Sequence, residues 1–245
     1  MNALLLILVA YVVGSIPTGY WVVKATKGID LLTVGSGSTG TTNVLRSAGK
    51  GAAAFVFIVD ILKGFFPVWL SIYAGQHGWL SDVPPHLVPW VAFVVALTTL
   101  VGHSKSIFLK FKGGKSAATG LGAMGAMSLL AASGAFGVFL AVLWIGKIVS
   151  LSSITAVISA AIIMQFVNGE PAYVAFCALG AAYVVLRHKE NIKRLLAGTE
   201  PKIGQKLEDV TGKGKSDVKL NQPSTESEPL SKSLGSTNLE DANNG

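Results

Sequence analysis

Seven apolar runs separated by polar connections occupy most of the chain. They cover residues 3–23, 52–75, 86–102, 116–131, 134–148, 152–168 and 171–187. A helix needs about 20 mostly apolar residues to cross a bilayer, with a range of about 17 to 25. Between the fourth and fifth runs, glycine-rich sequence near Ser133 and Gly134 predicts a break between two helices. The pattern predicts an all-α, polytopic integral membrane protein with seven transmembrane helices.

Positive charge is distributed unevenly between the connections. Lys and Arg gather after the first, third, fifth and seventh runs, whereas 76–85, 132–133 and 169–170 contain neither. Because cytoplasmic loops carry an excess of Lys and Arg, the N-terminus is predicted outside and the C-terminus in the cytoplasm. The first run lacks the basic n-region and cleavage pattern of a signal peptide, so we expect a retained helix.

Composition agrees with a membrane location. Of the 245 residues, 51% are hydrophobic and 13% are charged, against about 25% charged in soluble domains. Basic cytoplasmic loops and anionic substrates explain the net charge of +7, so we expect no nucleic-acid partner. Cys177 has no cysteine partner, and His77 and His86 have no ligand cluster nearby; we expect neither a metal nor a cofactor. We predict a membrane domain over 1–203 and a disordered cytoplasmic tail over 204–245.

The connection between the first two runs is rich in glycine and hydroxyl groups. It reads GSGSTGTTNVLR from Gly35 to Arg46. Gly35, Gly37 and Gly40 let backbone N–H groups approach an anion closely, and Arg46 adds a fixed charge. The spacing also matches a dinucleotide-binding loop, but the run that follows is too apolar and too long for a helix of a soluble sheet. The loop predicts a phosphate site at the membrane surface.

A second basic segment, KFKGGK, precedes the fourth run. Gly113 and Gly114, flanked by Lys112 and Lys115, can bind phosphate near the start of a helix. A Cβ at either glycine would intrude on the contact with a headgroup. His103, earlier in the same connection, serves either as a general base or as an interfacial hydrogen-bonding residue.

Polar residues also occur after the last run and inside the second. His188 and Asn191 are three residues apart and share a helix face. Asp60 and Lys63 have the same spacing within an apolar run. Ionisable residues at that depth are candidates for function, and a structural ion pair is the alternative.

Six short motifs occur in one order along the chain. They are GSIPTG (14–19), D-x-x-x-x-GSG-x-x-G-x-TN-x-x-R (30–46), DILKG (60–64), GH…F-x-x-FKGGK-x-x-AT (102–119), VSLSSI (149–154) and RH-x-x-NI-x-RL-x-x-G-x-E (187–200). Over about residues 1–203 they resemble the PlsY family, membrane glycerol-3-phosphate acyltransferases that use acyl phosphate. The resemblance implies a bacterial-type inner-membrane enzyme with a cytoplasmic active site. It would move a fatty acyl group to the 1-hydroxyl of glycerol 3-phosphate, giving lysophosphatidic acid and phosphate.

The resemblance also implies roles for individual residues. Catalytic roles fall to Ser36, Thr42, Asn43, Arg46, His188 and Asn191. Substrate binding falls to Gly35, Gly37, Gly40, His103, Lys112, Gly113, Gly114, Lys115 and Ser150, and structural support to Glu200. Two positions depart from the family pattern: Ser38 replaces the usual asparagine and Leu32 a frequent arginine. Neither change removes the backbone donors of the loop.

The chemistry requires little of the protein beyond positioning and charge. Acyl phosphate is already activated, so preorganised donors and cations suffice without a covalent intermediate. Either a histidine or a substrate phosphate oxygen acts as base. We expect membrane lipid and the two substrates as partners, and no obligate protein partner. The alternative function is a transporter of phosphorylated solutes, which predicts an inverted repeat and helices broken at mid-membrane; the sequence has no convincing repeat. A lipid-binding structural protein leaves the glycine-rich loop unexplained.

Overall fold

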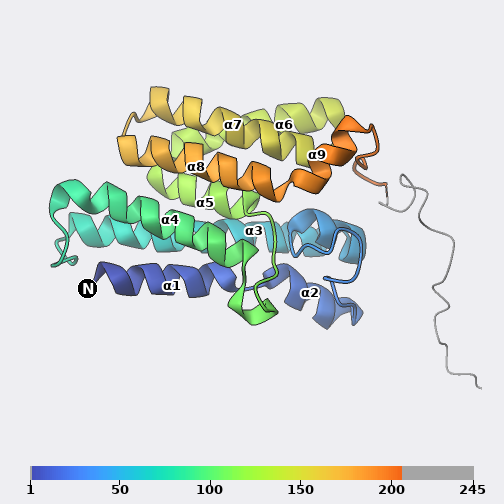
Figure 1. Cartoon of the computed structure of the whole chain (residues 1–245), viewed down its shortest axis with the longest axis horizontal. Coiled ribbons are helices and arrows are strands. Elements are labelled where there is room, and N and C mark those ends of the chain that lie inside the picture. Colours follow the sequence, from blue (N-terminus) through green and yellow to red (C-terminus); the bar gives the residue numbers. More distant parts are fainter. Residues whose placement is uncertain (1, 206–245) are drawn as a thin grey trace, which may run out of the picture. The chain divides into compact units, whose positions relative to one another are not determined.

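The computed structural model describes residues 2–205, and its regular elements there are helices (Figure 1). They are α1 (Ala3–Ser15), α2 (Thr18–Lys27), α3 (Thr41–Gln76), η1 (Pro85–Leu87), α4 (Val88–Ser104), η2 (Ile107–Leu109), α5 (Ala117–Met127), α6 (Leu129–Gly146), α7 (Val149–Val167), α8 (Pro171–Arg187) and α9 (Lys189–Leu196). The all-α prediction is confirmed for this part of the chain. Of the predicted tail, residues 206–245 lie outside the described residues.

The described helices include several of membrane-spanning length. Five segments qualify by length and apolar character: α1 with α2, α3, η1 with α4, α6 and α7. α8 with α9 would be a sixth, although the two helices meet at a 66° bend. α5 has only 11 residues, about half of a full span. A multi-pass membrane protein is therefore confirmed, seven full-length spans are not, and the orientation of the termini stays a prediction.

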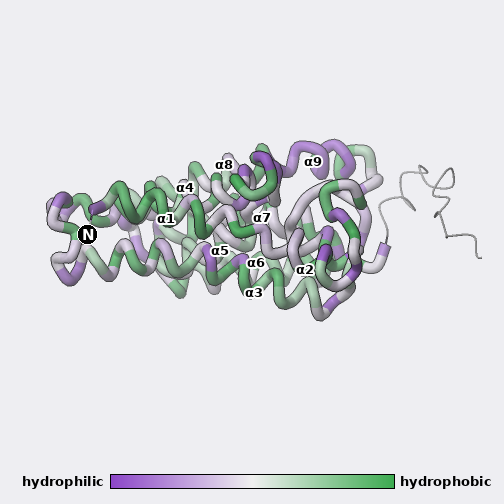
Figure 2. Tube along the Cα trace, turned by 90° about the horizontal axis from the view of Figure 1, so that it is seen from below, coloured by the Kyte–Doolittle hydropathy of each residue, from purple (hydrophilic) through white to green (hydrophobic). Residues whose placement is uncertain are grey.

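The polar elements gather at the end of the bundle away from the N-terminus. Figure 1 shows α2, α9 and the loop before α3 at that end, with α6, α7 and α8 on one side and α1, α3 and α4 on the other. The spanning helices are mostly hydrophobic, whereas α9 is strongly hydrophilic (Figure 2). This end of the bundle therefore faces the membrane surface.

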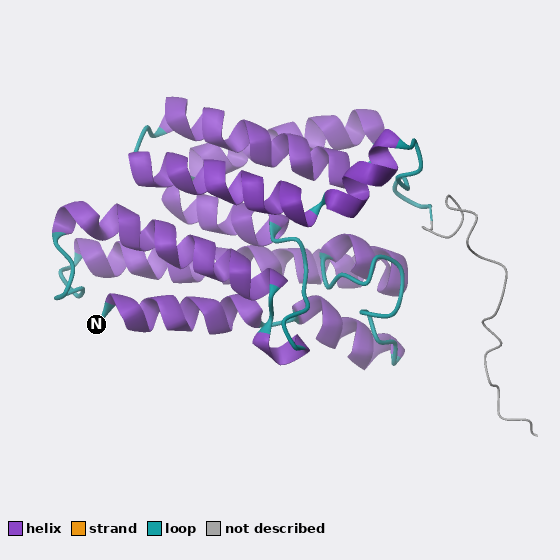
Figure 3. Ribbon diagram, in the orientation of Figure 1, coloured by secondary structure: helices purple, strands orange, loops and turns teal. Residues whose placement is uncertain are grey.

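Two helix boundaries differ from the prediction; Figure 3 shows the short loops that join the helices. The first run forms two helices, because Pro17 lacks an N–H and restricts Ile16 to extended backbone. The break in the run 116–148 occurs at Ser128, so the prediction at Ser133 and Gly134 is wrong. Ser128 has φ −158° and ψ 106°, and its hydroxyl accepts a 3.3 Å hydrogen bond from the Ala131 N–H. A serine N-cap thus starts α6, and glycine is tolerated inside a membrane helix.

α3 also begins earlier than predicted and is kinked near its start. Gly49 has φ 85° and ψ −177°, within a helix that runs from Thr41 to Gln76. This backbone conformation is essentially confined to glycine. The kink sets the first two turns of α3, which carry Asn43 and Arg46, at an angle to the membrane part.

Replacement of Gly49 by alanine is expected to lower both activity and melting temperature in detergent. A Cβ would meet no atom within 4 Å, so the cost is backbone strain of about 1–3 kcal/mol. Gly51→Ala is the matched control, since this glycine is helical, exposed and equally uncrowded. Alanine there should leave activity unchanged and stabilise the helix by roughly 0.5–1 kcal/mol. Equal behaviour of both variants would show that the kink is dispensable.

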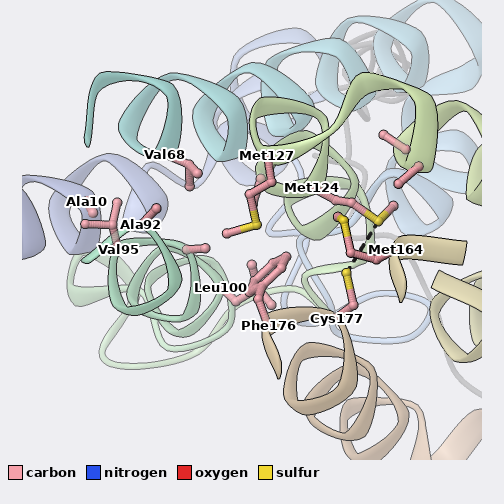
Figure 4. Close-up of a cluster of buried hydrophobic side chains, with 14 of the residues drawn as sticks. Ala10, Val68, Ala92, Val95, Leu100, Met124, Met127, Met164, Phe176 and Cys177 are labelled. Atoms are coloured by element: carbon pink, nitrogen blue, oxygen red, sulfur yellow. Dashed lines mark hydrogen bonds between the residues drawn. The ribbon is translucent and has the colours of Figure 1, made fainter. Parts of the chain in front are cut away.

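The closest packing joins α3 and α5. A Cβ at Gly64 would collide with the carbonyl of Thr119, and one at Gly122 with that of Ile61. Small residues allow such close backbone approach between membrane helices. Beside this contact lies a core rich in sulfur, shown in Figure 4, where the Cys177 thiol is 3.7 Å from the Met124 sulfur. Cys177 is buried and free, so it serves packing.

Candidate active site

A cavity of about 390 Å³ lies where the three polar segments of the sequence meet. From the predicted site residues it is lined by Ser36, Gly40, Thr42, Asn43, Arg46, His103, Lys115, Ser150, His188, Asn191 and Glu200. The structure thus brings together side chains from α3, α4, α7, α8, α9 and the loops between them. Five predicted residues do not line it: Gly35, Gly37, Lys112, Gly113 and Gly114.

Most of the cavity surface is apolar. Away from the polar side chains it continues along α5, α6, α7 and α8. Its apolar lining includes Met124, Phe136, Phe139, Leu143 and Phe176. A cavity with a polar, basic part and a long apolar part suits a ligand that combines a charged headgroup with a hydrocarbon chain.

Asn43 organises the glycine-rich loop. Its side-chain amide donates to the carbonyls of Leu31 (3.2 Å), Val34 (3.1 Å) and Ser38 (2.9 Å). Its Oδ1 accepts from the Ser36 N–H at 3.2 Å. Because Asn43 is 1% exposed, these bonds are shielded from water and hold the loop in one shape. These bonds make Asn43 a positioning residue, a role that the spacing of the sequence motif did not reveal.

The remaining loop residues follow from this arrangement. Gly35 and Gly37 have φ of 56° and 61°, the left-handed region that favours glycine. The Ser38 hydroxyl accepts a 3.3 Å bond from the Gly40 N–H and lines the cavity. Leu32 is half-buried and donates its backbone N–H to Asp30 at 2.9 Å. Neither departure from the family pattern interrupts the bonds of Asn43.

Arg46 lies one turn beyond Asn43 and lines the same cavity. Its side chain is half-buried, and among the described residues no hydrogen bond or ion pair joins it to another side chain. A guanidinium in such a place has its donors available to an anion.

Glu200 joins α7 and α9 on one wall of the cavity. Its Oε1 accepts from the Ser150 hydroxyl at 2.8 Å and from the Asn191 amide at 2.6 Å. Its Oε2 receives the Arg194 Nε–H at 2.7 Å. From the sequence alone, Arg194 could equally be a cation that binds lipid headgroups. Its position six residues before Glu200 was the only sign of the ion pair between these two residues.

Lys115 connects this wall with the second basic segment. Its ammonium donates to Oδ1 of Asn191, whose amide in turn donates to Glu200. The pKa of Lys115 is lowered to about 8, chiefly by burial; Glu200 opposes the decrease, and the nearby guanidinium groups contribute to it. An anion bound beside Lys115 would favour the charged form.

His188 occupies the junction of α8 and α9. Its Nδ1 is 2.7 Å from the Val184 carbonyl. Since a carbonyl can only accept, Nδ1 carries the proton and Nε2 is the acceptor of the neutral ring. His188 lines the cavity, so this nitrogen is available as a hydrogen-bond acceptor or base.

Gly113 and Gly114 have a different environment from the one expected. A Cβ at Gly113 would meet the His103 carbonyl, and one at Gly114 would meet the His103 ring. The expectation that a Cβ would reach a headgroup directly is therefore wrong, because α4 fills that space. Lys112 is exposed and does not line the cavity. Its backbone carbonyl accepts a hydrogen bond from the Ser106 N–H at 3.3 Å.

A bundle of apolar helices with this cavity defines a polytopic membrane protein with a site for an amphiphilic anion. The family model for glycerol-3-phosphate acyltransferases matches residues 4–198. The chain belongs to this family.

Curated relatives include two proteins that are each named glycerol-3-phosphate acyltransferase. The Nostoc sp. protein is 50% identical over 207 residues, covering 82% of this chain and 92% of the relative. The Synechocystis sp. protein is 47% identical over 209 residues, covering 84% of this chain and 93% of the relative.

Two solved structures of PlsY, an integral membrane glycerol 3-phosphate acyltransferase, have the same fold. The glycerol 3-phosphate form has a TM-score of 0.74 and 38% identity, covering 82% of this chain and 96% of the other. The lysophosphatidic acid form has a TM-score of 0.71 and 37% identity, covering 82% and 95%.

Proposed function

We propose that the protein transfers a fatty acyl group from acyl phosphate to the 1-hydroxyl of glycerol 3-phosphate. The observation that carries the proposal is a single cavity with Arg46 and Lys115 beside a long apolar lining. The loops at the end of the bundle that contains the cavity are basic, and the positive-inside rule assigns such loops to the cytoplasm. The reaction would therefore occur at the cytoplasmic face of a bacterial-type inner membrane.

Two of the polar segments bind the phosphate groups of the two substrates. Glycerol 3-phosphate binds beside Lys115, and acyl phosphate places its phosphate at Arg46 and the loop around Ser36. The hydrocarbon chain lies along the apolar lining. The attacking hydroxyl oxygen bonds to the acyl carbon, and the bond between that carbon and the phosphate oxygen breaks.

Proton transfer and charge stabilisation complete the reaction. The proton of the hydroxyl passes to His188 Nε2 or to a phosphate oxygen, while the departing phosphate keeps the electron pair. Arg46 and loop N–H groups stabilise the charge that develops. Neither a metal nor a cofactor is needed in this scheme, because the acyl donor is already activated.

The test uses purified protein with radiolabelled glycerol 3-phosphate and, in turn, acyl phosphate, acyl-CoA and acyl carrier protein as donors. We expect labelled lysophosphatidic acid with acyl phosphate alone. Product from another donor would change the donor assignment. The transporter alternative, which the comparisons do not support, predicts label accumulating unchanged inside proteoliposomes.

The affinity for glycerol 3-phosphate is expected to weaken as pH rises through about 8, the pKa of Lys115. Below that pH the ammonium is charged and attracts the phosphate, and above it the attraction is lost. The Michaelis constant for glycerol 3-phosphate, measured from pH 7 to 9 with saturating acyl phosphate, should rise about tenfold.

The control is Lys115→Arg, because a guanidinium stays protonated over this range. Its Michaelis constant for glycerol 3-phosphate should be almost independent of pH, whatever its absolute value. A variant that keeps the steep dependence of the wild type would assign the titration to another group.

A further inference from the structure

Three ionisable side chains are buried together where α3 packs against α4. Asp60, Lys63 and His103 are 2%, 6% and 6% exposed. The Lys63 ammonium lies 2.7 Å from Asp60 Oδ1 and also donates to the Ile16 carbonyl at 2.9 Å. His103 Nδ1 is 3.8 Å from the same Asp60 oxygen. Burying such groups is costly unless they are paired, and the Lys63 charge offsets that of Asp60.

Asp60 and His103 line the cavity themselves, and His103 also contacts Gly114, which does not line it. The Gly114 N–H donates to the His103 carbonyl at 3.1 Å, and Arg187 Nη2 donates to the Gly114 carbonyl at 3.2 Å. The imidazole of His103 occupies the place that a side chain at Gly114 would take. Gly114 is thus held between α4 and the end of α8, and the next residue along the chain is Lys115.

We propose that Asp60 and His103 are positioning residues for the headgroup site. The Asp60 carboxylate lies beside the His103 ring without a direct hydrogen bond and orients the ring electrostatically. The ring in turn sets how deeply Gly114 lies and where Lys115 meets its ligand. This inference rests on the proposed function, since it assumes that Lys115 binds glycerol 3-phosphate. It also assigns Asp60 and Lys63 a function through His103, beyond that of an ion pair between helices.

The proposal predicts which kinetic constants a substitution in the cluster will change. A group that only stabilises the bundle would change abundance, melting temperature and both Michaelis constants together. A group that positions Lys115 would chiefly change the constant for glycerol 3-phosphate, because the first loop, which takes acyl phosphate, is held separately by Asn43.

The first experiment exchanges volume between His103 and Gly114. Gly114→Ala alone should raise the Michaelis constant for glycerol 3-phosphate about tenfold, because the Cβ pushes the segment off the ring. His103→Ala removes the obstructing atoms, so the double variant should bind glycerol 3-phosphate better than Gly114→Ala, although loss of the ring keeps it weaker than wild type. The melting temperature in detergent should follow the same order, which tests the contact without an activity assay.

The second experiment removes the Asp60 charge. Because Asp60→Asn leaves Lys63 buried without a counter-ion, Asp60→Asn/Lys63→Gln is made beside it to keep the cluster neutral. In the double variant the constant for glycerol 3-phosphate should rise about fivefold, and that for acyl phosphate should change less than about twofold.

The outcomes separate the two claims. A wild type that forms no lysophosphatidic acid would overturn the proposed function. An active wild type whose His103→Ala/Gly114→Ala variant is no better than Gly114→Ala, in both kinetics and melting temperature, would overturn the inference alone. Equal effects of the neutral Asp60/Lys63 variant on both substrates would also overturn it.

Discussion

Replacement of Arg46 by alanine is expected to lower kcat by about a thousandfold while the protein still inserts and folds. Arg46 lines the cavity without an ion pair among the described residues, so its charge is directed at a ligand rather than at the fold. Preorganised donors acting on charge that develops in the transition state are worth about 10²–10³ each in kcat. A guanidinium adds charge and two donors in one plane.

The measurement is kcat and both Michaelis constants in detergent, with membrane abundance as the check on folding. Lys50→Ala is the matched control, because Lys50 is exposed on the same helix and outside the cavity. Arg46→Lys keeps the positive charge but loses the planar pair of guanidinium donors, so this variant should retain partial activity. Unchanged kcat with a raised Michaelis constant would make Arg46 a ground-state binding group.

The sequence was sufficient to predict a helical membrane protein, because long apolar runs have few other structures available. The sequence was not sufficient to predict where each helix begins and ends. The break at Ser128 depends on one hydroxyl bonding to the Ala131 N–H, whereas the glycines near Ser133 look more disruptive but lie inside α6. The first run likewise looks continuous until the effect of Pro17 on backbone donors is considered.

The meeting of three loops at one cavity could also be expected from the sequence. Lys and Arg occur in every second connection, which predicts that the three loops lie on the same side of the membrane. Loops on the same side can meet at one site. The roles within the cavity could not be read in the same way. Spacing says nothing about which side chains face each other across helices, so the contact between His103 and Gly114 and the central position of Glu200 emerge only from packing.

Asn43→Asp is expected to abolish activity almost completely, by at least about a hundredfold, and to lower the melting temperature. The substitution is nearly isosteric, so it leaves no cavity. It replaces the amide that donates to three loop carbonyls with a carboxylate that can only accept. The carboxylate would then face the carbonyl oxygens of Leu31, Val34 and Ser38 with no proton between them. The loop would open, and its N–H groups and Ser36 would leave the positions that the reaction requires.

Asn168→Asp provides the matched control for the same chemical change. Asn168 is exposed, and its Oδ1 accepts from the Glu170 N–H at 3.1 Å, a bond that a carboxylate can also accept. Its variant should keep wild-type turnover and melting temperature. If Asn43→Asp retained turnover with both Michaelis constants unchanged, the loop would not need the amide. If it lost turnover with no change in melting temperature, Asn43 would act on the substrate itself rather than through the loop.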